Sequence, residues 1–371
     1  QLGNLHLLVG QYAEAHEQYE RSLALAEELN DKHGIARILH QLGMIAYGQG
    51  DYDTAQEHNL RSLGIQGALG EKLGIAHTLH QLGMVFHAKG NHDEAREYYQ
   101  RSLVIEEDLQ DQRGMAATVH QMGILAAEQG AYAEAEQHYR RSMEIAEQVG
   151  DLVTKAANWH SLGDLADRQG QLDLAEERYR ASLEIREYLG DRLGIAASYH
   201  QLGLVRVARG DTEAAEGYHR QSLDIATELG SRYWIALNAH NLGNLACQRG
   251  EYAAAKAHYD RSLTIYEQMG DQANIAHTLH QLGVVAHAQG QLANAKLYYQ
   301  RSLQSKSELG DRWGLAATWA QLGLVAKAEN DLPLARRLWE QSLHIFQALG
   351  SPQAANVSGW LEAAAAQESA P

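Results

Sequence analysis

The sequence contains one cysteine, three prolines and two phenylalanines among its 371 residues. A single cysteine, Cys247, excludes a disulfide framework or a zinc site built from several thiolates, and it favours a reducing compartment such as the cytoplasm. The scarcity of proline, with abundant Ala, Leu, Glu, Gln and Arg, predicts an almost entirely helical chain. No signal peptide is present, and no apolar run approaches the roughly 20 residues that cross a bilayer, so we expect no membrane contact.

Positive charge is also scarce, with 31 Lys and Arg residues against 47 Asp and Glu residues and a formal net charge of −16. Nucleic-acid binding requires a basic face, so this balance argues against DNA or RNA as the main partner. It fits a basic or neutral protein partner, or only a well-solvated surface.

What the sequence does contain is a period of 40 residues without a single insertion. A period of this length is typical of stacked repeat proteins. One glycine marks every copy of the repeat. It recurs as Gly43, Gly83, Gly123, Gly163, Gly203, Gly243, Gly283 and Gly323, with Gly3 in a truncated first copy. A histidine precedes it by three residues as His40, His80, His120, His160, His200, His240 and His280, which we call the His ladder; Ala320 replaces it in the last copy.

Each repeat predicts two helices, at about 33–48 and 53–69 in the second copy. Asp31 is placed to cap the first helix, and Gly50 and Gly70 are placed to end the two helices. The equivalent caps are Glu71, Asp111, Asp151, Asp191, Ser231, Asp271, Asp311 and Ser351. Small residues at 43, 46 and 55 let the helices approach closely, and a large side chain at position 59 of most repeats fills the space between them.

The repeats divide the chain into an array over residues 1–351, a lone amphipathic capping helix at 352–366 and a tail at 367–371. The expected repeats are 1–30, 31–70, 71–110, 111–150, 151–190, 191–230, 231–270, 271–310 and 311–350. Since the chain starts at Gln1 in the middle of a repeat, we expect it to be part of a longer protein.

The pattern Leu39, Leu42, Gly43, Ala46, Ala55, Asn59 and Ser62 resembles the signature of the tetratricopeptide repeat (TPR). The longer period resembles the repeats of Pins-type adaptors, kinesin light chains and the arrays of bacterial signal-transducing ATPases and regulators. The resemblance implies an all-α solenoid, a right-handed superhelix of about nine helix-turn-helix units, whose first helices line a concave groove.

By this resemblance, positions 37, 40, 44 and 47 of each repeat face the groove. Besides the His ladder, the expected binding residues are Arg37, Met84, Asp164, Asp167, Leu204, Asn244, Val284 and Lys327. The His ladder has two readings that the sequence leaves open. Its imidazoles could hydrogen-bond the backbone of an extended peptide, or they could be a duplicated consensus that bonds the neighbouring helix. With contact to a ligand, affinity would change between about pH 5.5 and 7.5, where an unperturbed histidine titrates.

Two groups of histidines have spacings that a metal ion could use, although neither includes a carboxylate or thiolate. They are His77, His80 and His87 in one repeat, and His277, His280 and His287 in another. We expect no physiological metal and no other cofactor.

Nothing in the sequence predicts catalysis, because Gly-rich phosphate loops, His-Glu-x-x-His and Gly-x-Ser-x-Gly are all missing. Three functions remain open. The first is a non-catalytic scaffold that binds a protein or peptide segment along the groove. The second is a sensor or autoinhibitory arm of a larger signalling ATPase, transcription regulator or protease, with that module upstream in the same chain. The third is a structural spacer or a self-assembling solenoid.

Overall fold

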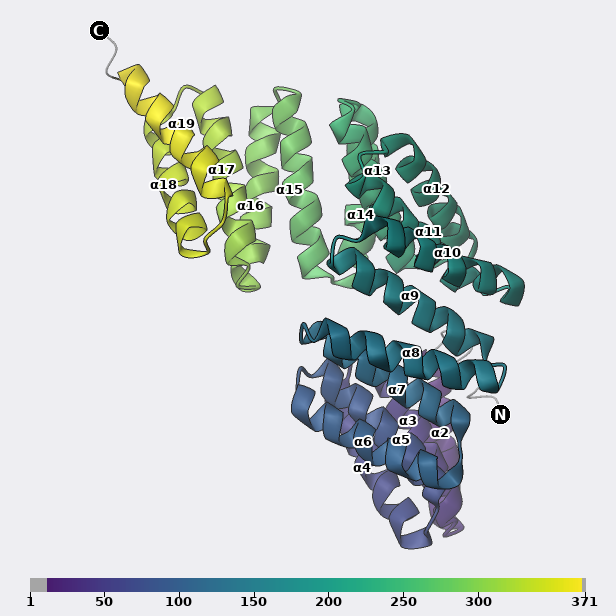
Figure 1. Ribbon diagram of the computed structural model, residues 1–371. Helices are drawn as coiled ribbons and strands as arrows, with labels where there is room; N and C mark the ends of the chain where they lie inside the picture. Colours follow the sequence, from purple (N-terminus) through teal and green to yellow (C-terminus); the bar gives the residue numbers. More distant parts are fainter. Residues whose placement is uncertain (1–11, 369–371) are drawn as a thin grey trace. The chain divides into compact units, whose positions relative to one another are not determined.

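The computed structural model describes residues 12–368, and every regular element in this range is an α-helix (Figure 1). The helices are α2 (Tyr12–Glu28), α3 (Lys32–Gly48), α4 (Tyr52–Leu69), α5 (Lys72–Ala88), α6 (His92–Leu109), α7 (Gln112–Glu128), α8 (Tyr132–Gln148), α9 (Leu152–Arg168), α10 (Leu172–Leu189), α11 (Arg192–Ala208), α12 (Thr212–Glu228), α13 (Arg232–Gln248), α14 (Tyr252–Met269), α15 (Gln272–Ala288), α16 (Leu292–Glu308), α17 (Arg312–Ala328), α18 (Leu332–Ala348) and α19 (Gln353–Glu368).

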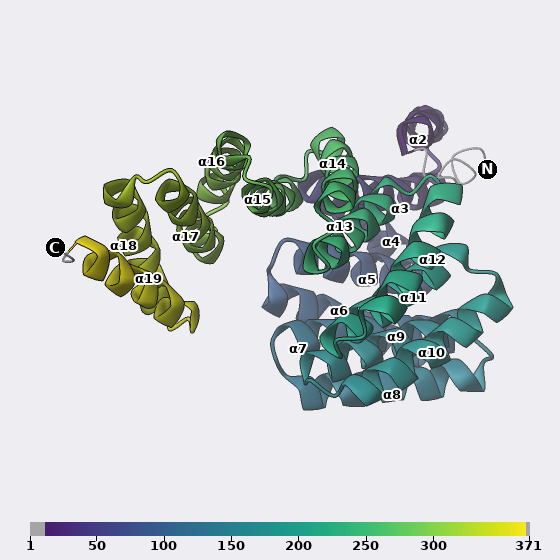
Figure 2. The same ribbon diagram turned by 90° about the horizontal axis from the view of Figure 1, so that it is seen from above.

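Consecutive helices pack in pairs, as the period predicts. The first helix of a repeat packs on the second, as α3 does on α4, and the second packs on the first helix of the next repeat, as α4 does on α5 (Figure 2). The chain divides into two compact units, residues 1–190 and 191–371, and the division falls between two repeats. Both units are built by the same pairing, so the fold is an all-α solenoid of TPR-like repeats. The first predicted repeat, 1–30, lies partly outside the described residues.

Aspartates begin most of the first helices, because a carboxylate can accept from the free backbone N–H groups of the first turn. The predicted caps Asp31, Asp111, Asp151, Asp191, Asp271 and Asp311 all accept such a bond. Glu71 and Ser231 also occupy the predicted N-cap positions, but without the side-chain bond. The longer Glu71 side chain instead contacts the His33 ring of the preceding repeat.

The predicted glycine ends are confirmed in the second repeat. Gly50 adopts φ +80°, a left-handed conformation that favours a residue without Cβ. In this geometry the amides of Gly50 and Asp51 donate to the carbonyls of Tyr47 and Ala46. The chain can therefore reverse within a few residues and return as the next helix.

In most helix pairs a glycine of the first helix lets a ring of the second helix lie against its backbone, whereas in the α3–α4 pair the Asn59 side chain lies against Gly43. A Cβ atom at Gly83 would lie 2.5 Å from the Tyr99 ring, and one at Gly283 would lie 2.5 Å from the Tyr299 ring. A second contact recurs beside it: a serine that recurs every 40 residues in the second helix donates to a carbonyl of the paired helix at 2.7–2.8 Å. The serines are Ser62, Ser102, Ser142, Ser182, Ser222, Ser302 and Ser342.

The predicted capping helix is present as α19. Val357 and Ala364 are buried, and the Trp360 ring lies 5.9 Å from the Trp339 ring of α18. The helix ends at Glu368 rather than at residue 366, so the predicted tail begins too early. Residues 369–371 of that tail lie outside the described range.

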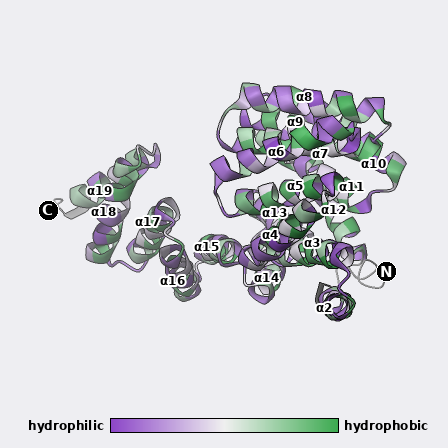
Figure 3. Ribbon diagram, turned by 90° about the horizontal axis from the view of Figure 1, so that it is seen from below, coloured by the Kyte–Doolittle hydropathy of each residue, from purple (hydrophilic) through white to green (hydrophobic). Residues whose placement is uncertain are grey.

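Every described helix mixes hydrophilic and hydrophobic residues (Figure 3). Among residues 12–368, no helix combines the length and the apolar character that crossing a membrane requires.

The glycine contact gives a first prediction. Gly283→Ala should lower the free energy of unfolding by about 1–3 kcal/mol, because the new methyl group overlaps the buried Tyr299 ring. Gly217→Ala is the matched control. That glycine lies in α12 with nothing within 4 Å of an added Cβ, so alanine should stabilise its helix by up to about 1 kcal/mol. Thermal and urea unfolding followed by circular dichroism measure both; equal effects would contradict the packing role.

Candidate functional site

Six of the seven His-ladder residues contact the next repeat, whereas the His160 Nδ1 atom lies 3.5 Å from Arg186 of its own repeat. The Nδ1 atoms of the six lie 2.9–3.3 Å from a polar atom two residues before the next ladder position. The pairs are His40–Thr78, His80–Thr118, His120–Asn158, His200–Asn238, His240–Thr278 and His280–Thr318. Sequence reasoning missed these partners, although the spacing of 38 residues is constant. The signal that could have revealed them is a small polar residue that recurs two positions before the next ladder position, on an otherwise apolar helix face.

The hydrogen-bond network fixes which nitrogen of the ladder carries the proton. Ser142 donates to the carbonyl of Ala116, so its oxygen accepts from the Nδ2 atom of Asn158 at 2.8 Å. The same Nδ2 atom also donates to the carbonyl of Thr154. The Asn158 Oδ1 atom therefore faces His120, and the His120 Nδ1 atom must donate to it.

The same arrangement recurs in the second unit with a different partner. Lys306 donates to the Thr318 hydroxyl at 2.9 Å, and that hydroxyl donates to the carbonyl of Gly314. The hydroxyl oxygen can then only accept from His280, whose Nδ1 atom carries the proton. The neutral rings of His120 and His280 consequently have their lone pairs on Nε2.

The Nε2 atoms form the part of the ladder that the fold leaves open. For His80, His120, His240 and His280, no group within residues 12–368 hydrogen-bonds Nε2, and these atoms are not buried. The rings themselves are half-buried. His120 and His280 therefore offer hydrogen-bond acceptors, not donors, on the first-helix face, by which we mean the surface at positions 37, 40, 44 and 47 of each repeat.

Burial keeps the ladder neutral. Burial is the largest cause that lowers the pKa of His80 and of His240 to about 4. At His80 the neighbouring imidazoles of His77, His40 and His120 lower the pKa further. At His240 the imidazole of His277 does the same. At His80 and His240 this argues against a pH dependence of ligand affinity between 5.5 and 7.5, which stays a prediction for the other ladder residues. An imidazole with a pKa of about 4 stays neutral throughout that range.

The second prediction concerns acid stability. Between pH 6.5 and 4 the unfolded chain binds a proton at His80 and the folded chain does not, so stability falls as the pH falls. His80→Asn keeps a donor toward Thr118 and removes the titrating ring. It should make the slope shallower by up to about 1.4 kcal/mol per pH unit. Urea unfolding at pH 4.5–7 measures this slope. His344→Asn, an exposed position, is the control, and an unchanged slope in His80→Asn would refute the prediction.

Two of the expected specificity residues are held by buried tyrosines. The Tyr179 hydroxyl donates to Asp164 at 2.7 Å, and the Tyr259 hydroxyl donates to Asn244 at 2.7 Å. Burial raises the pKa of the Asp164 carboxyl. These side chains are oriented by the fold before any partner arrives. Where the position is apolar, as at Val284, the hydroxyl of the buried Tyr299 has no partner within the described residues.

This difference gives a third prediction. Tyr259→Phe should cost about 1 kcal/mol of stability, because it removes the bond to Asn244. Tyr299→Phe should be neutral or stabilising, because it removes a buried hydroxyl that bonds nothing within residues 12–368. The two tyrosines occupy equivalent positions in the same unit, so unfolding curves of the two variants compare the two changes in stability directly. A larger loss for Tyr299→Phe would contradict the assignment.

The other expected binding residues differ in exposure. Arg37, Asp167 and Lys327 are exposed, whereas Met84, Leu204 and Val284 are half-buried on the same helices as their ladder residues.

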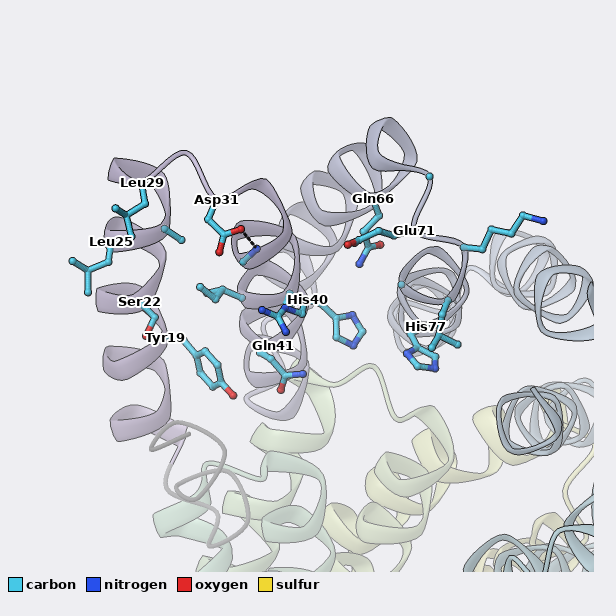
Figure 4. A pocket seen from close by; sticks show the side chains of 18 of the residues that line it. Tyr19, Ser22, Leu25, Leu29, Asp31, His40, Gln41, Gln66, Glu71 and His77 are labelled. Carbon is cyan, nitrogen blue, oxygen red and sulfur yellow. Dashed lines mark hydrogen bonds between the residues drawn. The ribbon is translucent and has the colours of Figure 1, made fainter. Parts of the chain in front are cut away.

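A pocket of about 1180 Å³ lies on this face at the start of the first unit (Figure 4). Arg37, His40 and His77 line it, together with the exposed side chains of Leu25 and Leu29 from α2. The structure thus brings Arg37, His40 and His77 together. Beside them lie the apolar side chains of Leu25 and Leu29, which the sequence did not predict as part of a site.

The two groups of histidines with metal-compatible spacing are not assembled into sites. Among the described residues, neither His77, His80 and His87 nor His277, His280 and His287 form a cluster of ligand atoms. His80 and His280 are each bonded to a threonine of the next repeat. His87 instead lies beside Glu128, so the expectation that no carboxylate approaches these histidines is wrong.

With this geometry in place, the family can be stated. The sequence matches the family described as Tetratricopeptide repeat over residues 1–68, 34–108, 74–148, 114–187, 154–228 and 234–308. The chain belongs to this family, which supports a protein-interaction scaffold. A search of curated protein sequences found no match.

Solved structures share the fold at low sequence identity. BtubC (BKLC) from P. vanneervenii matches with a TM-score of 0.52 and 22% identity, over 60% of this chain and 90% of that one. A signal transduction ATPase with numerous domains from Pyrococcus horikoshii, which has a tetratricopeptide repeat sensor, gives 0.64 and 15%, over 85% of this chain and 50% of that one. A Rap protein complexed with competence and sporulation factor gives 0.55 and 16%, over 95% and 98%.

Proposed function

We propose that this chain is a non-catalytic scaffold that binds an extended peptide or protein segment on the first-helix face of its repeats. The observation that supports this most is that the Nε2 atoms of four ladder residues are not fully buried and have no hydrogen-bond partner within residues 12–368. An extended peptide has regularly spaced backbone N–H groups, and these would donate to the ladder. Carbonyl groups of the ligand would find no donor on these imidazoles.

The two ring nitrogens of a ladder histidine would then have different roles. Nδ1 joins the repeats, and Nε2 contacts the ligand. Arg37, Asp164, Asp167, Asn244 and Lys327 would set register and specificity. The apolar residues Met84, Leu204 and Val284 would contact side chains of the ligand.

Charge favours a basic ligand. The chain has a formal net charge of −16, and complementary charge accelerates association and selects against acidic partners. The Rap protein with a similar fold was solved in complex with competence and sporulation factor, which shows a partner bound by that protein. A ligand segment in a cytoplasmic partner remains our expectation for this chain.

The fourth prediction tests the ladder directly. Linear peptides that bind the wild-type array are selected from a random library displayed on phage. Their affinity for the double variant His240→Asn/His280→Asn should fall about tenfold, because two hydrogen bonds are lost. Asparagine retains a donor toward Thr278 and Thr318, so the junction between repeats persists.

His344→Asn, an exposed histidine of α18 in the same unit, is the matched control and should bind normally. Unfolding curves confirm that each variant is folded. N-methylation of the peptide backbone, one amide at a time, should reproduce the loss at the amides that donate to the ladder. Selected peptides that bind the double variant as tightly as the wild type would refute the proposal.

A second candidate role is a sensor arm of a larger signalling protein. The fold it shares with the Pyrococcus horikoshii protein favours this role, since that protein has a tetratricopeptide repeat sensor and this chain covers half of its length. An ATPase, regulator or protease module encoded in the same gene would support the sensor role. A gene that encodes repeats only would refute it.

A further inference from the structure

Three metal-ligating side chains from three helices meet at one place in the first unit. His87 lies in the last turn of α5, His92 begins α6, and Glu128 ends α7. Their ligand atoms all lie within 4.8 Å of one another. The His87 Nε2 atom lies 2.7 Å from the Glu128 Oε2 atom, and the His87 and His92 ring centroids are 5.8 Å apart.

The same place in other repeats does not bring three metal-binding groups together. In the preceding repeat the equivalent residues are Tyr47, Tyr52 and Ala88, and the two tyrosine rings lie 5.6 Å apart, almost the separation of His87 and His92. Further along the array the equivalents are Cys247, Tyr252 and Ala288, and then His287, Leu292 and Ala328, so each of these sets holds a single group that could bind metal. Only the set at 87, 92 and 128 replaces all three positions with groups that bind metal. The repeat consensus, therefore, does not account for this set.

The polar interactions of the cluster are incomplete. The His92 Nδ1 atom is buried and has no hydrogen-bond partner within residues 12–368. A buried polar atom without a partner is unfavourable, and a metal ion bonded to that nitrogen would satisfy it. The Glu128 side chain is 44% exposed, so an ion can enter from solvent.

We propose that His87, His92 and Glu128 bind a divalent transition-metal ion of the zinc type, with water in the remaining position. Two imidazoles and one carboxylate form a ligand set that zinc accepts. Zinc bonds of about 2.0–2.2 Å in a tetrahedral site place the ligand atoms about 3.4 Å apart. This spacing is longer than the 2.7 Å between His87 and Glu128 and shorter than the 4.8 Å within which all three ligand atoms lie. Small side-chain rotations complete the site, and the ion would tie the third repeat to the fourth.

Isothermal titration of tag-free protein with Zn²⁺ tests the proposal. The wild type should bind one ion more tightly than any other. Glu128→Gln and His92→Leu should weaken this binding by about 100-fold, because each removes a direct ligand. Leucine already occupies the equivalent position 292, so the fold accommodates it. His287→Leu is the matched control, since it removes the equivalent lone histidine and should leave the tightest site unchanged.

Two further readouts keep the test independent of folding. Crystals soaked in Zn²⁺ should give an anomalous peak between the three side chains, and Zn²⁺ should raise the melting temperature of the wild type but not of Glu128→Gln. Zinc binding that is equal in all four proteins would place the ion elsewhere and overturn the proposal. So would a titration without binding, which would leave His87 and Glu128 as an ion pair only.

Discussion

A ring pressed against a glycine is the contact on which the rest of the array depends. Gly83 lacks a Cβ atom, so the Tyr99 ring can lie against the backbone of the first helix. The ring then lies 5.7 Å from the His80 ring and limits where that imidazole can sit. From there the His80 Nδ1 atom reaches Thr118 of the next repeat. One close approach therefore sets the helix pair, the histidine and the junction to the following pair, and stacking of neighbours is what stabilises a solenoid.

This arrangement explains how one residue can be structural and still available for binding. A neutral imidazole has one donor and one acceptor. The junction between repeats uses the donor, and burial keeps the ring neutral so that the acceptor persists at physiological pH. A charged ring would have a proton on both nitrogens and would offer ligands a donor instead. The polarity of the first-helix face thus depends on how deeply the histidines are buried, which is a property of the stacked repeats and not of one helix.

The sequence predicted the helices well because the signals that set them are local. Cap residues, helix-ending glycines and the spacing of small residues act within one repeat, and the helix at Lys32–Gly48 begins within one residue of its expected start. The site was harder to predict because its contacts cross repeats. Glu128 lies 41 residues from His87, and only the stacking of α5 on α7 brings them together. Which nitrogen of His120 carries the proton depends on a chain of bonds through Asn158 and Ser142, and no spacing in the sequence reveals it.

The small differences between repeats matter because the backbone that surrounds them is nearly constant. Behind the ladder, one buried position holds Glu106 in the first unit and Lys306 in the second. Burial raises the pKa of the Glu106 carboxyl and lowers the pKa of the Lys306 ammonium to about 8. After burial, the charge of Lys306 is the next largest cause that lowers the pKa of His280, to about 3. Identical ladder residues therefore do not share one electrostatic environment. The difference arises from a side chain behind the ladder and not from the ladder residue itself.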